Sequence, residues 1–278
     1  MRWLLLTFLY LSIAQAHATP LSCGGLSGED YSRFFRNSST LATKKTYIPN
    51  MLEVEAYFKE WLLSENTSQT FKEMFFQLHH LAANGSSGRS TYRPPKSPPN
   101  MRIGEKRQVA PVHLIFDQTV IKEILKLTSL EWRTDRDAIY RIKLREPPPV
   151  LPTFFARGEK PNRVGQIEMV HAMDHELEAI HSKMSHLLSE IRLDLQQKKP
   201  TRTVLEKLAY YYQLGCFAHT FERINNSILM AQVNVVLSLL SITPIPHGNM
   251  DMIMRSVDTD KATEYFFQQI EHVNGPIK

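Results

Sequence analysis

Histidine and carboxylate side chains gather in one stretch of the chain, whose members are His171, Asp174, His175, Glu178, His181 and His186. His171 and His175 are four residues apart, so on a helix both imidazoles share one face, and Glu178 lies one turn further along. Such spacing can hold a metal ion. The zinc-protease pattern has a Glu directly after its first His, which this stretch lacks. The alternative is a solvated polar face opposite Leu177 and Met184.

A second candidate site lies in the segment His-Thr-Phe-Glu-Arg-Ile-Asn-Asn-Ser at residues 219–227. Here a histidine ends one predicted helix, a polar turn follows, and Asn225, Asn226 or Ser227 is suited to cap the next helix. Free backbone N–H groups at the start of a helix, reinforced by the helix dipole, form an anion site. His219 could then take a proton from a hydroxyl that attacks a phosphate bound there.

This segment resembles the motif of the Fic family of nucleotidyl transferases (the Fido superfamily), His-Pro-Phe-x-(Asp/Glu)-Gly-Asn-Gly-Arg. His219 falls on the family's catalytic base, Phe221 on its apolar anchor and Asn225 on its conserved asparagine. The flanking residues 208–218 and 228–240 also look like the helix that leads to the motif and the buried helix behind it. The resemblance extends over the C-terminal two-thirds of the chain in the order of elements, but is detailed only around the motif.

The segment also departs from the family pattern. Ile224 and Asn226 replace two glycines, and a β-branched residue such as Ile224 is expected to resist the positive φ angles of a tight anion nest. Ser227 replaces the arginine that neutralises phosphate charge, Glu222 lies one position early for the acidic metal ligand, and Arg223 occupies the acidic place. Since phosphoryl transfer depends on positioning and charge neutralisation, these changes predict weak or altered activity.

The resemblance implies transfer of a nucleotide, as AMP, or of another phosphate-containing group onto a hydroxyl of a target protein. It also implies ATP or another nucleotide with Mg²⁺ as the cofactor. The resemblance implies that His219 is the catalytic base and that Asn225 positions the loop or the substrate. Arg223, Asn226 and Ser227 are further candidates for nucleotide contacts and Glu222 for a Mg²⁺ contact, through a remodelled loop that the family pattern does not supply. His171 and His175 are the alternative metal ligands, by their spacing on a helix. The competing hypothesis is a secreted helical binding protein, a pseudo-enzyme that kept the scaffold. A third interpretation is a plain helix–turn–helix whose Phe221 packs in the core.

The elements that would position these residues are mostly helices, which apolar residues at steps of three and four predict. The predicted helices are 51–62, 67–83, 117–127, 170–191, 203–217, 228–240 and 258–273, with a short strand or hairpin arm within 109–116. The fold class is therefore mainly α, and the resemblance adds a helical Fic-like core with a small β-hairpin or strand element. Adjacent His79 and His80 point in different directions on a helix, which favours a structural role.

Composition and the position of the Gly/Ser/Pro-rich segment divide the chain into four parts. Residues 1–18 have a basic start, a short apolar run and small residues at Ala16 and Ala18, which is typical of a cleaved signal peptide and predicts a secreted or periplasmic protein. The remaining parts are an N-terminal helical region (19–83), a Gly/Ser/Pro-rich linker or loop (84–108) and the Fic-like helical domain (109–278). An exported Fic-like protein fits a bacterial effector by analogy.

Charge, hydropathy and cysteine content exclude several classes of partner and scaffold. The net charge is +5 and the Lys and Arg residues are scattered, so no nucleic-acid partner is expected. The apolar run at the start is too short for a permanent membrane helix, so no integral membrane segment is expected. Two cysteines, Cys23 and Cys216, exclude a disulfide-rich scaffold. They could form one bridge, or Cys216 could be a buried free thiol.

Overall fold

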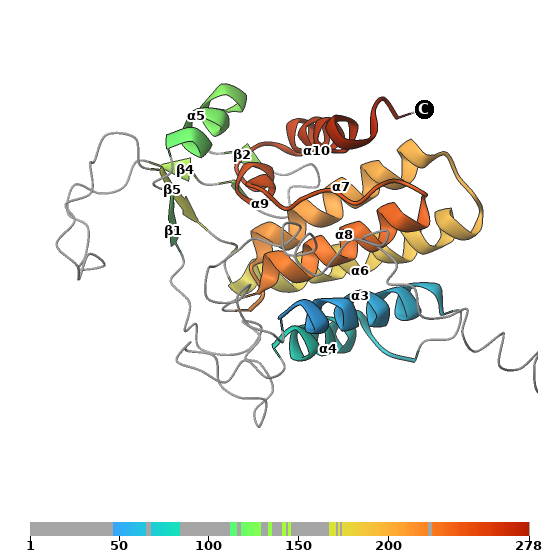
Figure 1. The fold of residues 1–278 in the computed structure, drawn as a ribbon. Coiled ribbons are helices and arrows are strands. Elements are labelled where there is room, and N and C mark those ends of the chain that lie inside the picture. Colours follow the sequence, from blue (N-terminus) through green and yellow to red (C-terminus); the bar gives the residue numbers. More distant parts are fainter. Residues whose placement is uncertain are drawn as a thin grey trace, which may run out of the picture.

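The described part of the chain is mainly helical, which confirms the predicted mainly α fold class (Figure 1). The structure is a computed structural model. It describes residues 47–64, 68–83, 112–115, 118–128, 133–134, 141–142, 144–145, 167–170, 172, 174–221 and 224–277. The predicted signal peptide and the whole Gly/Ser/Pro-rich segment (84–108) lie outside the described residues.

Two helices, α3 (Tyr47–Leu63) and α4 (Phe71–Ala83), form a pair at the bottom of Figure 1. A capping box starts α4: the Thr70 N–H donates to Glu73 Oε2 at 2.8 Å, and the Glu73 N–H donates to Thr70 Oγ1 at 3.2 Å. This exchange sets the first residue of α4 later than the sequence predicts. Both helices pack against α8 and α6 of the main body, so the pair is part of one hydrophobic core.

Short strands and one helix separate this pair from the long helices. Their bounds are β1 (Val112–Ile115), α5 (Gln118–Leu127), β2 (Arg133–Thr134), β3 (Arg141–Ile142), β4 (Leu144–Arg145) and β5 (Ile167–Val170). β5 lies between β1 and β4 and is antiparallel to both, while β2 pairs with β3. The Ala172 N–H then donates to Phe217 O at 3.2 Å, which joins the end of the sheet to the end of α7.

The longest helix, α6 (Asp174–Gln196), runs antiparallel to α7 (Thr201–Ala218), to which a tight turn connects it. The sequence places the start of this helix at Val170. Val170 is instead the last residue of β5, where it pairs with Val112. The apolar strand residue Val170 happens to lie at helical spacing from the apolar residues of the helix. Periodicity alone therefore places the start of the helix too early.

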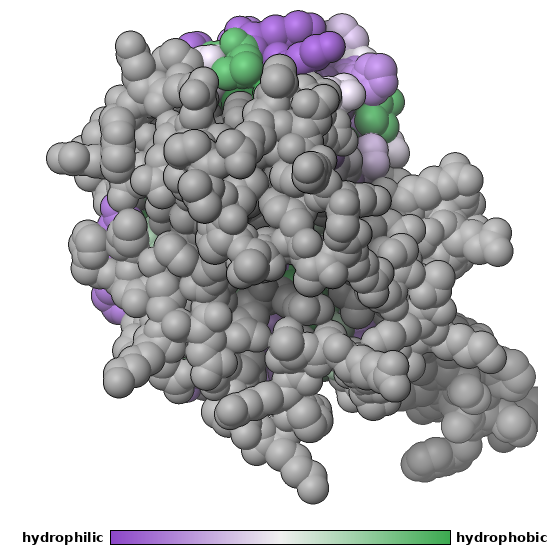
Figure 2. Space-filling view, turned by 90° about the vertical axis from the view of Figure 1, so that its left-hand side faces the viewer, coloured by the Kyte–Doolittle hydropathy of each residue, from purple (hydrophilic) through white to green (hydrophobic). Residues whose placement is uncertain are grey.

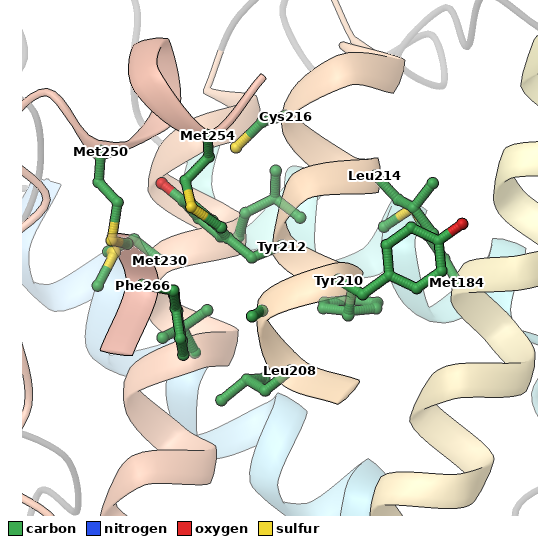
Figure 3. Packing of buried hydrophobic residues seen from close by; sticks show 14 of the residues in the cluster. Met184, Leu208, Tyr210, Tyr212, Leu214, Cys216, Met230, Met250, Met254 and Phe266 are labelled. Atoms are coloured by element: carbon green, nitrogen blue, oxygen red, sulfur yellow. The ribbon is translucent and has the colours of Figure 1, made fainter. Parts of the chain in front are cut away.

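Helix α7 lies at the centre of the body, in contact with α6, α8, α9 and α10. Every residue from Leu208 to Ala218 is buried. Figure 3 shows that side chains on opposite faces of α7 pack against different elements: Tyr210 points toward Met184 of α6, whereas Tyr212 points toward Met254 of α9. At Gly215 a Cβ atom would lie 2.4 Å from Leu229 Cδ2, so any other residue would require the Leu229 side chain of α8 to shift.

The last three helices are α8 (Asn225–Leu239), α9 (Met250–Met254) and α10 (Thr259–Asn274). Two asparagines fix the segment that leaves α8. The Ile245 N–H donates to Asn234 Oδ1 at 3.1 Å and Asn234 Nδ2 donates to Ile245 O at 3.2 Å. Asn274 does the same with Thr243, at 2.8 and 3.1 Å. We call this arrangement, in which one amide satisfies both backbone groups of one residue, an asparagine bracket.

The surface of the described residues is largely polar where it can be followed. On the face drawn in Figure 2, the described residues that are visible are mostly hydrophilic, with a few hydrophobic residues among them at the top. None of the described helices combines the length and the apolar character that a membrane crossing requires.

Candidate functional site

His219 is the residue at which α7 ends. It adopts the left-handed conformation at the C-cap, with φ 44° and ψ 56°, and its N–H donates to Gly215 O at 3.3 Å. That conformation is common at helix ends, where glycine or asparagine usually adopts it. The side chain is half-buried, whereas Thr220 and Phe221 after it are buried. The chain therefore turns inward directly after the histidine.

Thr220 is held by a histidine of α6. His181 Nε2 and Thr220 Oγ1 are 2.8 Å apart, and both side chains are buried. The sequence interpretation placed His181 on a solvated polar face, and for this residue the interpretation is wrong. The reason is a contact that lies far away in sequence: the His181 ring lies against Phe71 and Phe75 of α4, which cover that side of α6.

Phe221 is the anchor of the turn. Its side chain is 1 % exposed and is surrounded by three rings of α4. The His79 ring stacks on it with 4.0 Å between centroids and 25° between planes, and Phe75 stacks at 5.5 Å. Phe76 meets it edge-on at 6.0 Å. The core position of Phe221 was expected, but the source of its packing partners in the N-terminal helical region was not.

The turn closes through a third asparagine bracket. The Phe221 N–H donates to Asn225 Oδ1 at 2.7 Å, and Asn225 Nδ2 donates to Phe221 O at 2.6 Å. Between them, Ile224 adopts the left-handed conformation with φ 68°. A β-branched residue is expected to resist positive φ, and Ile224 nevertheless adopts it. The Asn225 bracket on one side and the first turn of α8 on the other hold the backbone of Ile224 in this conformation. Its side chain packs partly against the core.

The start of α8 differs from the predicted capping. Ile224 is the N-cap and offers no side-chain hydrogen bond, while Asn225, Asn226 and Ser227 are already helical. The Ile228 N–H is the first to bond within the helix, to Ile224 O at 3.1 Å. The backbone N–H groups of residues 225–227 are thus the amino end of the helix dipole. Such an end favours a negatively charged group.

A buried charged cluster lies behind the first turn of α8. Asn226 Nδ2 donates to Asp251 Oδ2. Asp251 also lies 3.9 Å from both His247 Nδ1 and Arg255 Nη2, and all three of these side chains are buried. Burial raises the pKa of the Cys216 thiol, and the negative charge of Asp251 raises it further. The cluster brings a carboxylate and a guanidinium close to the site without exposing either.

The remaining candidate residues divide into those that can be placed and those that cannot. Ser227 is buried in the first turn of α8. Glu222, Arg223 and His171 lie outside the described residues, and His175 belongs to α6 without a described side chain. In the part of the chain that the structure describes, no group of three or more His, Cys, Asp or Glu residues is arranged to hold a metal ion.

Three contacts near the candidate site were not predicted from the sequence, namely those of His79, His181 and Asp251. His79 does carry a signal: Phe71, Phe75 and His79 follow one another at steps of four, so the histidine belongs to an apolar stripe. No sequence pattern indicates the burial of Asp251, because a carboxylate in a five-residue helix is expected at the surface. Cys216 is a free, buried thiol, which agrees with one of the two alternatives for it.

No protein-family model, no curated protein and no solved structure matches this chain. The likeness to the Fic motif remains a prediction from residues 219–227 and their flanks.

Proposed function

We propose that this chain is an exported Fic-like protein that binds the phosphates of a nucleotide at the turn between α7 and α8. The observation that carries the proposal is the geometry of that turn. Two left-handed residues, His219 and Ile224, enclose it, and the N–H groups of residues 225–227 lie at the start of α8, where the N-cap residue Ile224 makes no side-chain hydrogen bond. An anion at this place meets both the donors and the positive end of the α8 dipole.

The chemistry follows from the half-buried histidine at the rim of this turn. A hydroxyl of a target protein attacks the α-phosphorus of the nucleoside triphosphate, a new O–P bond forms, and the bond to the β-phosphate breaks. Pyrophosphate leaves, and His219 accepts the hydroxyl proton. Asn225 keeps the turn in shape through its bracket on Phe221. The roles of Glu222 toward Mg²⁺ and of Arg223 toward phosphate belong to the proposal.

A second candidate is a secreted helical binding protein that retains the scaffold without transfer chemistry. The contact between Asn226 and Asp251 favours it, because a buried carboxylate behind the first turn of α8 opposes a second negative charge there. The side chain of Ile224 also occupies a position where the family has glycine. Both features reduce the room and the positive potential that a triphosphate needs.

One experiment separates the two candidates. The chain is incubated with Mg²⁺ and ATP labelled in the α-phosphate, together with candidate target proteins, and thermal unfolding is followed in parallel. Saturating ATP is expected to raise Tm by about 5 °C. His219→Ala should keep this shift and lose label transfer, while the control His186→Ala, at an exposed histidine of α6, should keep both. A Tm shift without transfer supports nucleotide binding alone, and the absence of both overturns the nucleotide proposal in favour of the binding protein.

A further inference from the structure

Helix α4 belongs to the N-terminal helical region, more than 130 residues before the candidate site in sequence, yet it makes the closest aromatic contacts of the turn. Phe71, Phe75 and His79 form a ridge along α4 at steps of four. The ridge faces two residues that adjoin or contact the turn, because His181 lies against Phe71 and Phe75 while Phe221 lies against Phe75 and His79. The turn therefore rests on α4.

Among these contacts, that between His79 and Phe221 is the tightest. Its centroid distance of 4.0 Å is shorter than the 5.5 Å to Phe75 and the 6.0 Å to Phe76. The two planes differ by 25°, so the rings are stacked, and His79 is 2 % exposed. An aromatic pair of this kind stabilises a contact beyond what burial alone provides. His80, the next residue, is exposed and takes no part.

Phe221 is also the residue through which the turn is fixed internally. Its N–H and C=O are both bonded to Asn225, the first residue of α8, and His219 precedes it by two residues. A shift of the Phe221 ring moves the backbone that the Asn225 bracket holds. Such a shift also alters the N–H groups of residues 225–227 and the orientation of the His219 side chain.

We infer that His79 is a positioning residue for the candidate site: its ring, stacked on Phe221, fixes the turn that carries His219 and the start of α8. The link from turn geometry to ligand affinity rests on the proposed nucleotide function. The link from His79 to turn geometry does not.

The test compares four forms of the full chain: the original, His79→Ala, His79→Phe and the matched control His80→Ala. Native-state hydrogen exchange is measured without any nucleotide at the Phe221 amide, which is bonded to Asn225 Oδ1, and at the Ile228 amide, which is bonded to Ile224 O. His79→Ala should accelerate exchange at these amides roughly three- to tenfold, the range that a stacked aromatic pair supports. Amides at the centre of α7 should exchange as before. His79→Phe, which keeps a flat ring, should restore protection, and His80→Ala should leave it unchanged.

Either of two results with His79→Ala would overturn the inference: unchanged exchange at the turn, or equal acceleration throughout the chain, which indicates a loss of global stability only. Failure of His79→Phe to restore protection would also overturn it. If His79→Ala does not fold, His79→Leu replaces it, because leucine fills the space without a ring. ATP with Mg²⁺ is then titrated into each form, and His79→Ala should bind about three- to tenfold more weakly. Absence of ATP binding to the original chain counts against the proposed function alone and leaves the exchange result standing.

Discussion

Asn225 holds the backbone of Phe221 from both directions, accepting its N–H at 2.7 Å and donating to its carbonyl at 2.6 Å. Both residues are buried, so water cannot replace either bond. This single side chain closes the turn that begins at His219, and it explains how a turn with two left-handed residues other than glycine persists. The bracket is the local cause of the site's shape.

Asn225→Ala should therefore destabilise the fold by about 2–4 kcal/mol, because two buried backbone groups lose their partners. Asn274→Ala is the matched control, since Asn274 forms the same bracket with Thr243 at an exposed place, where water can substitute. Urea denaturation of the two variants measures the difference. Equal losses in both would show that burial of the Asn225 bracket contributes nothing.

The strain at Ile224 can be measured by comparing two truncations. Ile224→Ala and Ile224→Gly remove nearly the same side chain, but only glycine adopts φ 68° without a steric cost. The glycine variant should be the more stable of the two by about 1 kcal/mol, which reverses their order in ordinary helix positions. Chemical denaturation gives the order, and a more stable alanine variant would mean that Ile224 is unstrained.

The buried cluster should respond strongly to the loss of one charge. Asp251→Asn leaves the guanidinium of Arg255 without its carboxylate neighbour in a dry environment, and the expected loss of stability is about 3–5 kcal/mol. Replacing both residues, as in Asp251→Leu with Arg255→Met, should cost less than Asp251→Asn alone. Thermal unfolding of the single and double variants provides the comparison, and an additive double variant would argue against coupling.

Cys216 should be inert to alkylation in the folded chain. Burial and the charge of Asp251 raise the pKa of its thiol well above the ordinary range, so the reactive thiolate is scarce at pH 8. In a Cys23→Ser background, iodoacetamide should label Cys216 only after denaturant is added, as mass spectrometry can follow. Rapid labelling in native buffer would contradict the buried position.

The capping box of α4 predicts a pH dependence with a definite sign. Hydrogen bonds from the Thr70 N–H and hydroxyl lower the pKa of Glu73, so its contribution to stability is fully present above the unfolded value of about 4.3. It is lost as the pH falls through the lower folded value. Glu73→Gln should lose less stability than the original chain between about pH 5 and pH 3. Denaturation midpoints at these two pH values measure the difference, and identical pH profiles would contradict the prediction.

The helices could be predicted because their apolar stripes are long and regular. The stripes at Met51–Leu62 and Leu177–Ile191 each identify a helix that exists, with errors only at the ends. The ends depend on other forces. Val170 joins β5 because Val112 pairs with it, and α4 begins at Phe71 because Thr70 caps it. Neither strand pairing nor helix capping produces a periodic pattern of apolar residues in the sequence.

The local motif of the candidate site could be predicted from the sequence, but the packing that holds it could not. The order of His219, Phe221 and Asn225 is readable from the residue types and predicts a histidine, an anchor and a turn. The packing that fixes them comes from His79 and His181. The apolar stripe of α4 indicates that His79 is buried, but no local pattern indicates which distant residue either histidine contacts. The conformation of Ile224 could not be predicted, because propensity disfavours it and tertiary contacts decide it.

The asparagine brackets change how variation in this sequence should be weighed. An exchange of Asn for Asp is scored as mild in sequence comparison, since the two side chains have nearly the same shape. A carboxylate has no donor, so at Asn225, Asn234 or Asn274 it would face a backbone carbonyl with its own negative charge. At these three positions the nominally conservative change is the disruptive one. Distant relatives of this chain should then be recognised by retained amides at loop junctions as much as by a retained histidine.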